Sequence, residues 1–168
     1  MSDVVLVDAN DQELGTLEKL EAHKNGLLHR AFSIFIFNSQ GELMLQQRAT
    51  SKYHCGGLWT NTTCSHPAPG EKALDAAHRR LKEEMGFDCE LSEIFSFTYK
   101  KTFENGLTEH EFDHVFIGYY DNDPKINTEE ADSWKWISIE KLQTDIKNHP
   151  ESYTYWFIKS LPRVLAER

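Results

Sequence analysis

The sequence predicts an α+β sandwich, in which strands form the centre of the molecule and helices pack around them. Three observations support this: two pairs of strand-like segments joined by short turns, a helical repeat of apolar residues between them, and helical patterns near the end of the chain. The chain has 168 residues, of which 39% are hydrophobic and 27% charged. It shows no internal repeat or long linker. We therefore expect a single domain over residues 1–168 that buries its own core.

The first part of the chain is expected to be mostly strand. Val4–Val7 is predicted to form a short strand. Ala31–Phe37 and Glu42–Gln47 flank a glycine-containing turn, which is typical of a hairpin. Residues 48–69 are rich in Gly, Pro, Thr, Ser and His and lack periodicity, so they are expected to form a long loop. Loops of this length in compact domains are usually functional.

A helix and a second hairpin should follow. From Glu71 to Met85 four apolar residues recur at helical spacing, and Gly86 is a good terminator. These are Leu74, Ala77, Leu81 and Met85. Ile94–Phe103 and Leu107–Tyr120 flank an Asn-Gly turn, which predicts a hairpin. The C-terminal part should hold one further strand and then two helices separated at Pro150: Trp134–Ile139, Ile139–Lys147 and Ser152–Ala166.

The overall charge excludes some partners. With 27 acidic and 18 basic residues the net charge is −9, which argues against binding to nucleic acid or to anionic membrane surfaces. No apolar run approaches the length of a membrane span, and the N-terminus lacks the pattern of a signal peptide. The cysteine count of three is poor material for a disulfide framework. We therefore expect a cytoplasmic protein.

Two carboxylates share one face of a predicted strand. The two-residue period of Leu107–Tyr120 places Glu109 and Glu111 on the face that becomes apolar farther along, so both should point inward. Two buried carboxylates repel each other, and a metal ion would relieve that cost. The alternative, a solvated strand end with exposed acids, is about as probable from the strand alone.

Histidines could complete a metal site. His23, His29 and His66 would supply nitrogen ligands if loops bring them to the two carboxylates, and such a set suits Mn²⁺ or Zn²⁺ better than Mg²⁺. Scattered histidines are usually surface or core residues, so spacing alone is weak support. No role is assigned to the others: His54, His78, His110, His114 and His149.

The loop before the first long helix carries a second candidate group. Cys64 stands two residues before His66, and a buried structural thiol is the ordinary interpretation of such a cysteine. A nearby metal or cation would instead favour the thiolate. Within the helix, Arg80 and Glu84 are four residues apart, which on a surface helix usually means an ion pair.

Eight short segments, taken in order, carry a family resemblance: Gly15–Lys19, His23, Leu28–Ser33, Arg48–Lys52, Leu58–Asn61, Cys64–Pro67, Glu109–Glu111 and Tyr155–Trp156. Together they resemble the metal-dependent, non-flavin isopentenyl diphosphate isomerases of the Nudix superfamily. The resemblance implies a single Nudix-like catalytic domain, an α/β/α sandwich with a central mixed sheet flanked by helices. It also implies interconversion of isopentenyl and dimethylallyl diphosphate by alkene protonation and deprotonation through a carbocation.

The resemblance further implies roles for individual residues. One ion, Mn²⁺, Mg²⁺ or Zn²⁺, would be held by His23, His29, His66, Glu109 and Glu111. The acid–base residues would be Cys64 and Glu111, with Tyr99 assisting Glu111. The substrate diphosphate would lie on Lys19, Arg48, Lys52 and Arg80, and Trp156 would cover the reacting carbons. A second ion, Mg²⁺ brought with the diphosphate, would be held by Glu84 and the carbonyl of Cys64.

Two departures from the general Nudix helix pattern bear on the reaction. Ser65 stands where that pattern has Gly, and Arg80 stands where it has Glu. Loss of that carboxylate removes part of the cluster with which Nudix hydrolases activate water, which favours the isomerase over the alternative, a Nudix diphosphate hydrolase. A non-catalytic sensor of the same fold is the third hypothesis. The expected partner is a small diphosphate, and the chain should be a monomer or weak homodimer.

A third departure concerns Cys55, in a segment where many relatives carry Pro before the second Gly. It places a second thiol near the site. The ordinary interpretation is an inert side chain that could be oxidised if exposed.

Overall fold

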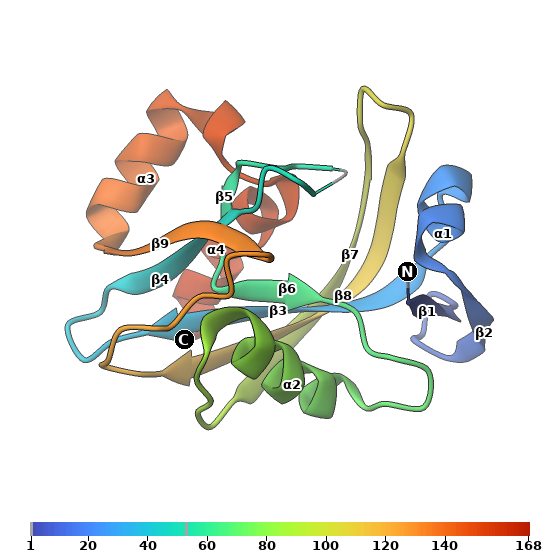
Figure 1. Ribbon diagram of the computed structural model, residues 1–168, viewed down its shortest axis with the longest axis horizontal. Helices are drawn as coiled ribbons and strands as arrows, with labels where there is room; N and C mark the ends of the chain where they lie inside the picture. Colours follow the sequence, from blue (N-terminus) through green and yellow to red (C-terminus); the bar gives the residue numbers. More distant parts are fainter. Residues whose placement is uncertain (1, 53) are drawn as a thin grey trace.

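Within residues 2–52 and 54–168, which the computed structural model describes, nine strands form one mixed sheet with helices on both faces (Figure 1). The strands are β1 (Asp3–Val7), β2 (Glu13–Glu18), β3 (His29–Phe37), β4 (Leu43–Arg48), β5 (Trp59–Thr60), β6 (Thr63–Ser65), β7 (Ser92–Thr102), β8 (Thr108–Tyr119) and β9 (Ala131–Ile137). The helices are α1 (Lys19–Asn25), α2 (Ala73–Met85), α3 (Ile139–Asn148), the short 3₁₀ helix η1 (Pro150–Ser152) and α4 (Tyr155–Glu167). The predicted sandwich of a mixed sheet between helical layers is confirmed.

Strand β3 is the central strand of the sheet. It pairs in parallel with β8 over its whole length, from His29 opposite Glu111 to Phe37 opposite Tyr119. Strand β8 also pairs antiparallel with β7, which confirms the second predicted hairpin. Successive residues of β3 point to opposite faces, and both faces are apolar because helices cover both.

The two faces of the sheet bury separate cores. On one face, Phe35 and Phe37 of β3 pack with residues of α3 and α4. On the other face, Phe32, Ile34 and Ile36 pack against α2. Three of the four predicted apolar positions of α2 are buried, namely Ala77, Leu81 and Met85, whereas Leu74 is 42% exposed.

The first predicted hairpin forms only next to its turn. Strands β3 and β4 pair at Phe37 and Leu43 and then part. The segment with β5 and β6 fills the gap, so that β5 pairs with β4, and Cys64 of β6 pairs with Ser33 of β3. The predicted long loop 48–69 therefore contains two short strands that the sequence pattern did not indicate. These strands carry the candidate thiol into the sheet.

Buried polar side chains replace the missing hydrogen bonds between β3 and β4. Thr62 Oγ1 donates to the carbonyl of Met44 at 2.6 Å and accepts from the N–H of Ile36 at 3.0 Å. Asn61 Nδ2 donates to the carbonyl of Ile34 at 3.1 Å. Backbone groups without water must be paired inside the protein, and these side chains satisfy that requirement. We call residues 60–63 the polar wedge.

The segment before β3 folds into β2 and α1, and the sequence predicted neither. Glu18 caps α1 by accepting a hydrogen bond from the N–H of Glu21 at 3.0 Å. Gly26 ends the helix with a left-handed φ of 65°, a conformation that glycine adopts readily. This short helix buries His23 against the sheet.

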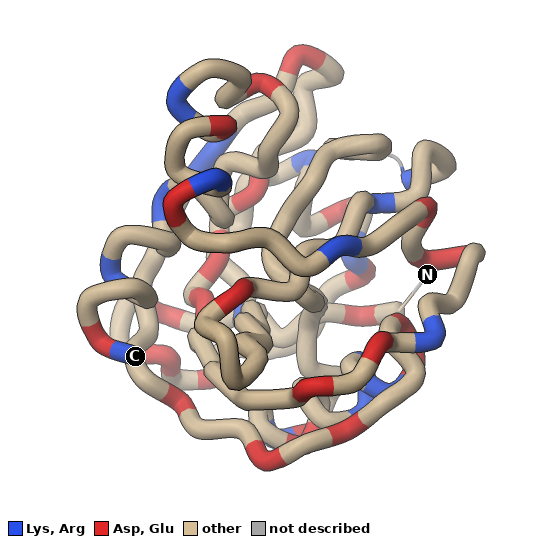
Figure 2. The backbone as a smooth tube through the Cα atoms, turned by 90° about the vertical axis from the view of Figure 1, so that its left-hand side faces the viewer, with Lys and Arg blue, Asp and Glu red and all other residues tan. Residues whose placement is uncertain are grey.

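Acidic and basic positions are interspersed over the side of the molecule drawn in Figure 2. Many charged side chains of the described residues form ion pairs with near neighbours, such as Arg79 with Glu83. Among the described residues no helix is long and apolar enough to cross a membrane.

Candidate active site

A small cavity of about 50 Å³ brings together residues from most of the predicted site segments. Its lining comprises Lys19, Arg48, Lys52, His54, Cys64, Ser65, His66, Arg80, Glu84, Glu109, Glu111 and Trp156. The other predicted residues contact this lining: Tyr99 and His29 bind Glu111, and His23 lies beside Glu109. The fold thus collects every predicted site residue in one place, although their roles stay predictions.

The carboxylates of β8 point inward. Glu109, Glu111 and Asp113 are 3%, 6% and 1% exposed, so the alternative of a solvated strand end is wrong. The apolar face continues as far as Ile117, whereas Tyr119 at the end of the strand is exposed. Burial of adjacent carboxylates requires compensating charge or protons. Histidines supply part of that compensation.

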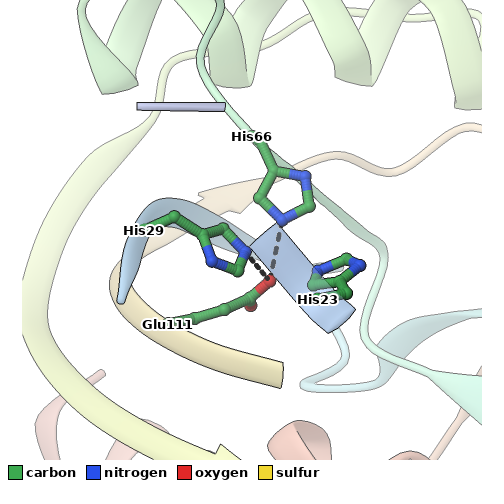
Figure 3. A group of neighbouring side chains, drawn as sticks. All are labelled: His23, His29, His66 and Glu111. Carbon is green, nitrogen blue, oxygen red and sulfur yellow. Dashed lines mark hydrogen bonds and ion pairs between the residues drawn. The ribbon is translucent and has the colours of Figure 1, made fainter. Parts of the chain in front are cut away.

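Glu111 is surrounded by imidazoles. Its Oε2 lies 3.2 Å from His29 Nε2 and 2.7 Å from His66 Nε2, and the rings of His23, His29 and His66 converge on it (Figure 3). Burial raises the pKa of a carboxyl group, but the electrostatic interaction with His66 and the hydrogen bonds with His29 and His66 outweigh this and lower the pKa of Glu111 well below its usual range. Glu111 is therefore ionised.

The hydrogen bonds of His29 show which of its ring nitrogens could bind a cation. Its Nδ1 lies 2.9 Å from the carbonyl of Leu27, which can only accept, so Nδ1 carries a hydrogen. In a neutral ring Nε2 would then turn a lone pair towards Glu111. Burial opposes a charge on His29, but Glu111 outweighs it and raises the pKa of the ring, so that a proton lies between the two groups. A metal cation could take the place of that proton.

A divalent ion fits the donor set. Ligand atoms of His23, His29, His66 and Glu111 lie within 4.8 Å of one another. Burial lowers the pKa of His23 to about 3 and that of His66 to about 4, so both rings are neutral, which is the form that binds metal. Three imidazoles and a carboxylate suit Zn²⁺ or Mn²⁺.

Glu109, the fifth predicted ligand, lies at the edge of this group. Its Oε1 is 3.9 Å from His23 Nε2. The same oxygen contacts His54 Nε2, and Oε2 accepts a hydrogen bond from Tyr99 at 2.8 Å. His54 is thus a site residue to which the sequence pattern gave no role. Its position in the predicted loop after Lys52 was the only available signal.

Tyr99 joins the two carboxylates. Its hydroxyl lies 2.5 Å from Glu111 Oε1 and 2.8 Å from Glu109 Oε2. Burial and then the two carboxylates raise the pKa of Tyr99 well above its usual value, so it stays a phenol. A phenol has a single hydrogen, so it can donate to one carboxylate only. The hydroxyl of Tyr99 therefore couples the hydrogen bonding of Glu109 to that of Glu111.

Cys64 reaches the cavity from β6. Its Sγ lies 3.8 Å from Arg48 Nη1. Burial raises the pKa of Cys64 to about 12 despite that cation, so the group is a thiol that holds its proton. The neighbouring Cys55 is also neutral, because burial raises its pKa to about 12. The low-pKa thiolate considered from the sequence is not favoured here.

Three buried donors in the cavity lining have no hydrogen-bond partner among the described residues: Arg48 Nε, Arg80 Nε and Trp156 Nε1. An unpaired buried donor is costly, so such a group indicates a ligand that accepts hydrogen bonds. The guanidinium of Arg48 also lies 5.3 Å from the ring centre of Trp156. The cavity is thus suited to an anion with an apolar part.

Arg80 forms the ion pair with Glu84 that its spacing suggests, with 2.5 Å between Nη2 and Oε2. It also binds Glu83 at 2.7 Å and Glu130 at 3.1 Å. Burial opposes charge on Arg80, but these carboxylates outweigh it and raise its pKa. The position where the general Nudix pattern has Glu is therefore a permanent cation.

Solved structures share this fold. A crystal structure of a protein from Deinococcus radiodurans matches with a TM-score of 0.73 at 21% identity, covering 88% of this chain and 90% of that one. A MutT Nudix hydrolase from Burkholderia pseudomallei matches with a TM-score of 0.66 at 18% identity, covering 82% of this chain and 98% of that one. At such identities the likeness concerns the fold alone.

The sequence pattern of the NUDIX domain matches residues 27–157, so fold and site define a Nudix-domain protein. Isopentenyl-diphosphate Delta-isomerase 2 of Aromatoleum aromaticum is 54% identical over 165 residues, which cover 98% of this chain and 87% of that protein. The isopentenyl-diphosphate Delta-isomerase of Serratia proteamaculans is 54% identical over 155 residues, which cover 92% of this chain and 87% of that protein. This chain belongs to the isopentenyl-diphosphate Delta-isomerase family.

Proposed function

We propose that this protein interconverts isopentenyl diphosphate and dimethylallyl diphosphate. The observation that carries the proposal is the placing of Cys64 and Glu111, from different strands, on one small cavity beside unpaired cationic donors. Relatives at 54% identity over most of the chain are named for this reaction. The isomerase function is thus favoured over the hydrolase alternative, which gives no role to Cys64.

The reaction moves one double bond by adding one proton and removing another. Protonation of the terminal alkene carbon gives a tertiary carbocation, and loss of a proton from the carbon next to the diphosphate-bearing carbon restores a double bond. Two proton carriers are needed, one that starts with a proton and one that starts without. Cys64 is a thiol and Glu111 a carboxylate in this structure, so the pair meets that condition.

Water would capture the carbocation, so the site must exclude it. The cavity is small, and Trp156 in its lining is 3% exposed. The electron-rich face of an indole can stabilise positive charge by cation–π attraction. We therefore assign Trp156 to cover the reacting carbons.

The diphosphate takes no part in the proton transfers but supplies binding energy and orientation. We assign it to the four cations of the cavity lining: Lys19, Arg48, Lys52 and Arg80. Burial, and then repulsion from Lys52 and Arg48, lowers the pKa of Lys19. A diphosphate bound among these cations would offset that repulsion.

Divalent metal belongs to this proposal. Mn²⁺, Zn²⁺ or Mg²⁺ would be held by His23, His29, His66 and Glu111, with Glu109 adjacent, and would supply positive charge that orients Glu111 and keeps it ionised. Glu84 and the carbonyl of Cys64 would hold a second Mg²⁺ brought with the diphosphate. The partner is then a small diphosphate, and a monomer or weak homodimer stays a prediction.

One assay separates the hypotheses. Purified protein is incubated with isopentenyl diphosphate and divalent metal, and the products are analysed. Formation of dimethylallyl diphosphate is expected. Release of phosphate or a monophosphate from a panel of diphosphates would support a hydrolase instead, and binding without any product would support a sensor.

A further inference from the structure

The loop after β4 and helix α2 each bring a predicted diphosphate-binding cation to the cavity: Lys52 and Arg80. A third residue, Glu130, binds both. Its Oε2 accepts a hydrogen bond from Lys52 Nζ at 2.6 Å and another from Arg80 Nη2 at 3.1 Å. Lys52 and Glu130 are 78 residues apart in the sequence, so only the fold brings the three side chains together.

Glu130 itself is firmly placed. It directly precedes β9, which pairs with β4. Its N–H donates to the carbonyl of Asn127 at 2.9 Å, and its carbonyl accepts from the N–H of Ala49 at 3.2 Å. Burial alone would raise the pKa of Glu130, but Lys52 and Arg80 outweigh it and lower the pKa, so the carboxylate is ionised. Glu130 is therefore a fixed negative charge between two cations.

Two neighbouring cations on long side chains repel each other and have many rotamers. A carboxylate oxygen shared between them offsets the repulsion and restricts both side chains before a ligand arrives. Preorganisation of this kind increases affinity because less ordering is required on binding. The other acceptors of Arg80, Glu83 and Glu84, lie on its own helix. Among the described residues, Glu130 is the one carboxylate outside α2 that binds Arg80.

We propose that Glu130 is a positioning residue for diphosphate binding, which holds Lys52 and Arg80 together as one anion-binding edge. The inference rests on the proposed function, because it takes Lys52 and Arg80 as ligands of the diphosphate. Glu130 contributes to affinity and not to proton transfer. Its loss should therefore raise KM for isopentenyl diphosphate and change kcat much less.

Calorimetric titration with inorganic pyrophosphate and Mg²⁺ tests the inference directly. Glu130→Gln keeps the side-chain volume and removes the charge, and it should bind pyrophosphate about tenfold more weakly than the wild type. The matched control is Glu129→Gln, which removes the same charge from the exposed neighbouring residue. The control should bind pyrophosphate as the wild type does.

A double-mutant cycle identifies the route of the effect. If Glu130 acts through Lys52, adding Glu130→Gln to Lys52→Gln should weaken pyrophosphate binding much less than it does in the wild type. A structural role would give the same loss in both backgrounds. Equal losses would therefore overturn the positioning role.

Other results would also overturn it. These are unchanged or tighter pyrophosphate binding by Glu130→Gln, or a loss confined to kcat. If Glu130→Gln does not fold, Glu130→Asp keeps the charge but shortens the side chain, and it should still weaken pyrophosphate binding.

The results also separate this inference from the proposed function. Wild-type turnover together with an unaffected Glu130→Gln variant would overturn the positioning role alone. Absence of wild-type turnover would overturn the proposed function, and the pyrophosphate titrations would still decide the role of Glu130.

Discussion

His29 and Glu111 are direct partners in the parallel ladder of β3 and β8, and their side chains meet at 3.2 Å between Nε2 and Oε2. The register of β3 and β8 therefore brings two members of the candidate metal group together. The remaining imidazoles arrive from less regular elements: His23 from the short helix α1, and His66 from the residue after β6. The other candidate ligands thus lie around Glu111.

The proposed proton carriers should be indispensable. Cys64→Ala and Glu111→Gln should each lower kcat by about 10²–10⁴-fold, because each removes one of two required proton carriers. The measurement is conversion of isopentenyl diphosphate by the purified variants, with circular dichroism to verify the fold. The control is Cys89→Ala, which removes a half-buried thiol that packs against the core on the α2 face of the sheet and does not line the cavity. This variant should retain turnover. Normal turnover by either site variant would contradict the mechanism.

Tyr99→Phe should impair turnover without unfolding the protein. It removes the hydroxyl that binds Glu111 at 2.5 Å and Glu109 at 2.8 Å but keeps the ring in the core. Hydrogen bonds to charged groups are strong, so kcat should fall by roughly 10- to 100-fold. Steady-state kinetics measures the change in kcat, and the melting temperature measures the change in stability. A large loss of thermal stability with unchanged kcat would show that Tyr99 has a structural role only.

Metal binding should depend on the buried histidines. His66→Ala removes a ligand whose Nε2 lies 2.7 Å from Glu111, and zinc or manganese affinity should fall by about 10-fold or more. Chelators should abolish turnover, and added divalent metal should restore it. His149→Ala is the control, because this ring is exposed and outside the group. Equal metal affinity of the two variants would exclude His66 as a ligand.

The metal-free protein should lose stability on acidification. The folded-state pKa values of His23 and His66 are about 3 and about 4, against an ordinary 6.5. Below about pH 6.5 the unfolded chain therefore binds more protons than the folded chain, so the free energy of unfolding should fall as the pH drops towards 4. His29, with its raised pKa, adds stability as the pH falls to about 6.5 and no further change below that, so it does not oppose the decline.

Denaturant titrations of chelator-treated protein over this pH range provide the measurement. His66→Asn should show a shallower decline, because one of the two depressed groups is gone. A steeper decline in that variant, or a wild-type stability that rises on acidification, would contradict the assignment of neutral rings.

Gly86 should be intolerant of a side chain. Its φ is 72°, and an added Cβ would clash with the carbonyl oxygen of Lys125, so the backbone must shift. Gly41 has a similar φ of 77°, but no described atom outside its chain neighbours lies within 4 Å of the Cβ position. Gly86→Ala should therefore be less stable than Gly41→Ala by about 1–3 kcal/mol. Denaturation midpoints of both variants test this, and equal values would refute it.

Long periodic elements could be predicted from the sequence, and short ones could not. The apolar repeat of α2 and the Asn-Gly turn between β7 and β8 are local signals, and both elements were anticipated. Helix α1 has seven residues, which is too short to be marked by periodicity. Strand β2 is largely exposed, and β5 and β6 have two and three residues. Their existence depends on pairing with distant strands.

The same distinction applies to the site. The inward face of β8 follows from a local period, and the burial of Glu109 and Glu111 confirms it. The histidines of the candidate metal group could be selected only from the family resemblance, because their spacing in the sequence does not show that they lie together. His54 and Glu130 were missed because their contacts are tertiary. Neither residue carries a local pattern that would distinguish it from an ordinary loop residue.

The polar wedge has a consequence for how the protein assembles. It bonds to both β3 and β4, and Thr60 Oγ1 lies at hydrogen-bond distance, 2.8 Å, from Thr154 Oγ1, which links the wedge to the start of α4. The candidate thiol therefore reaches its position only when sheet and C-terminal helix have met. Contacts between distant segments form slowly because loop closure costs entropy. A growing or partly folded chain thus has no assembled reaction centre, and activity should return as late in refolding as the last native contacts.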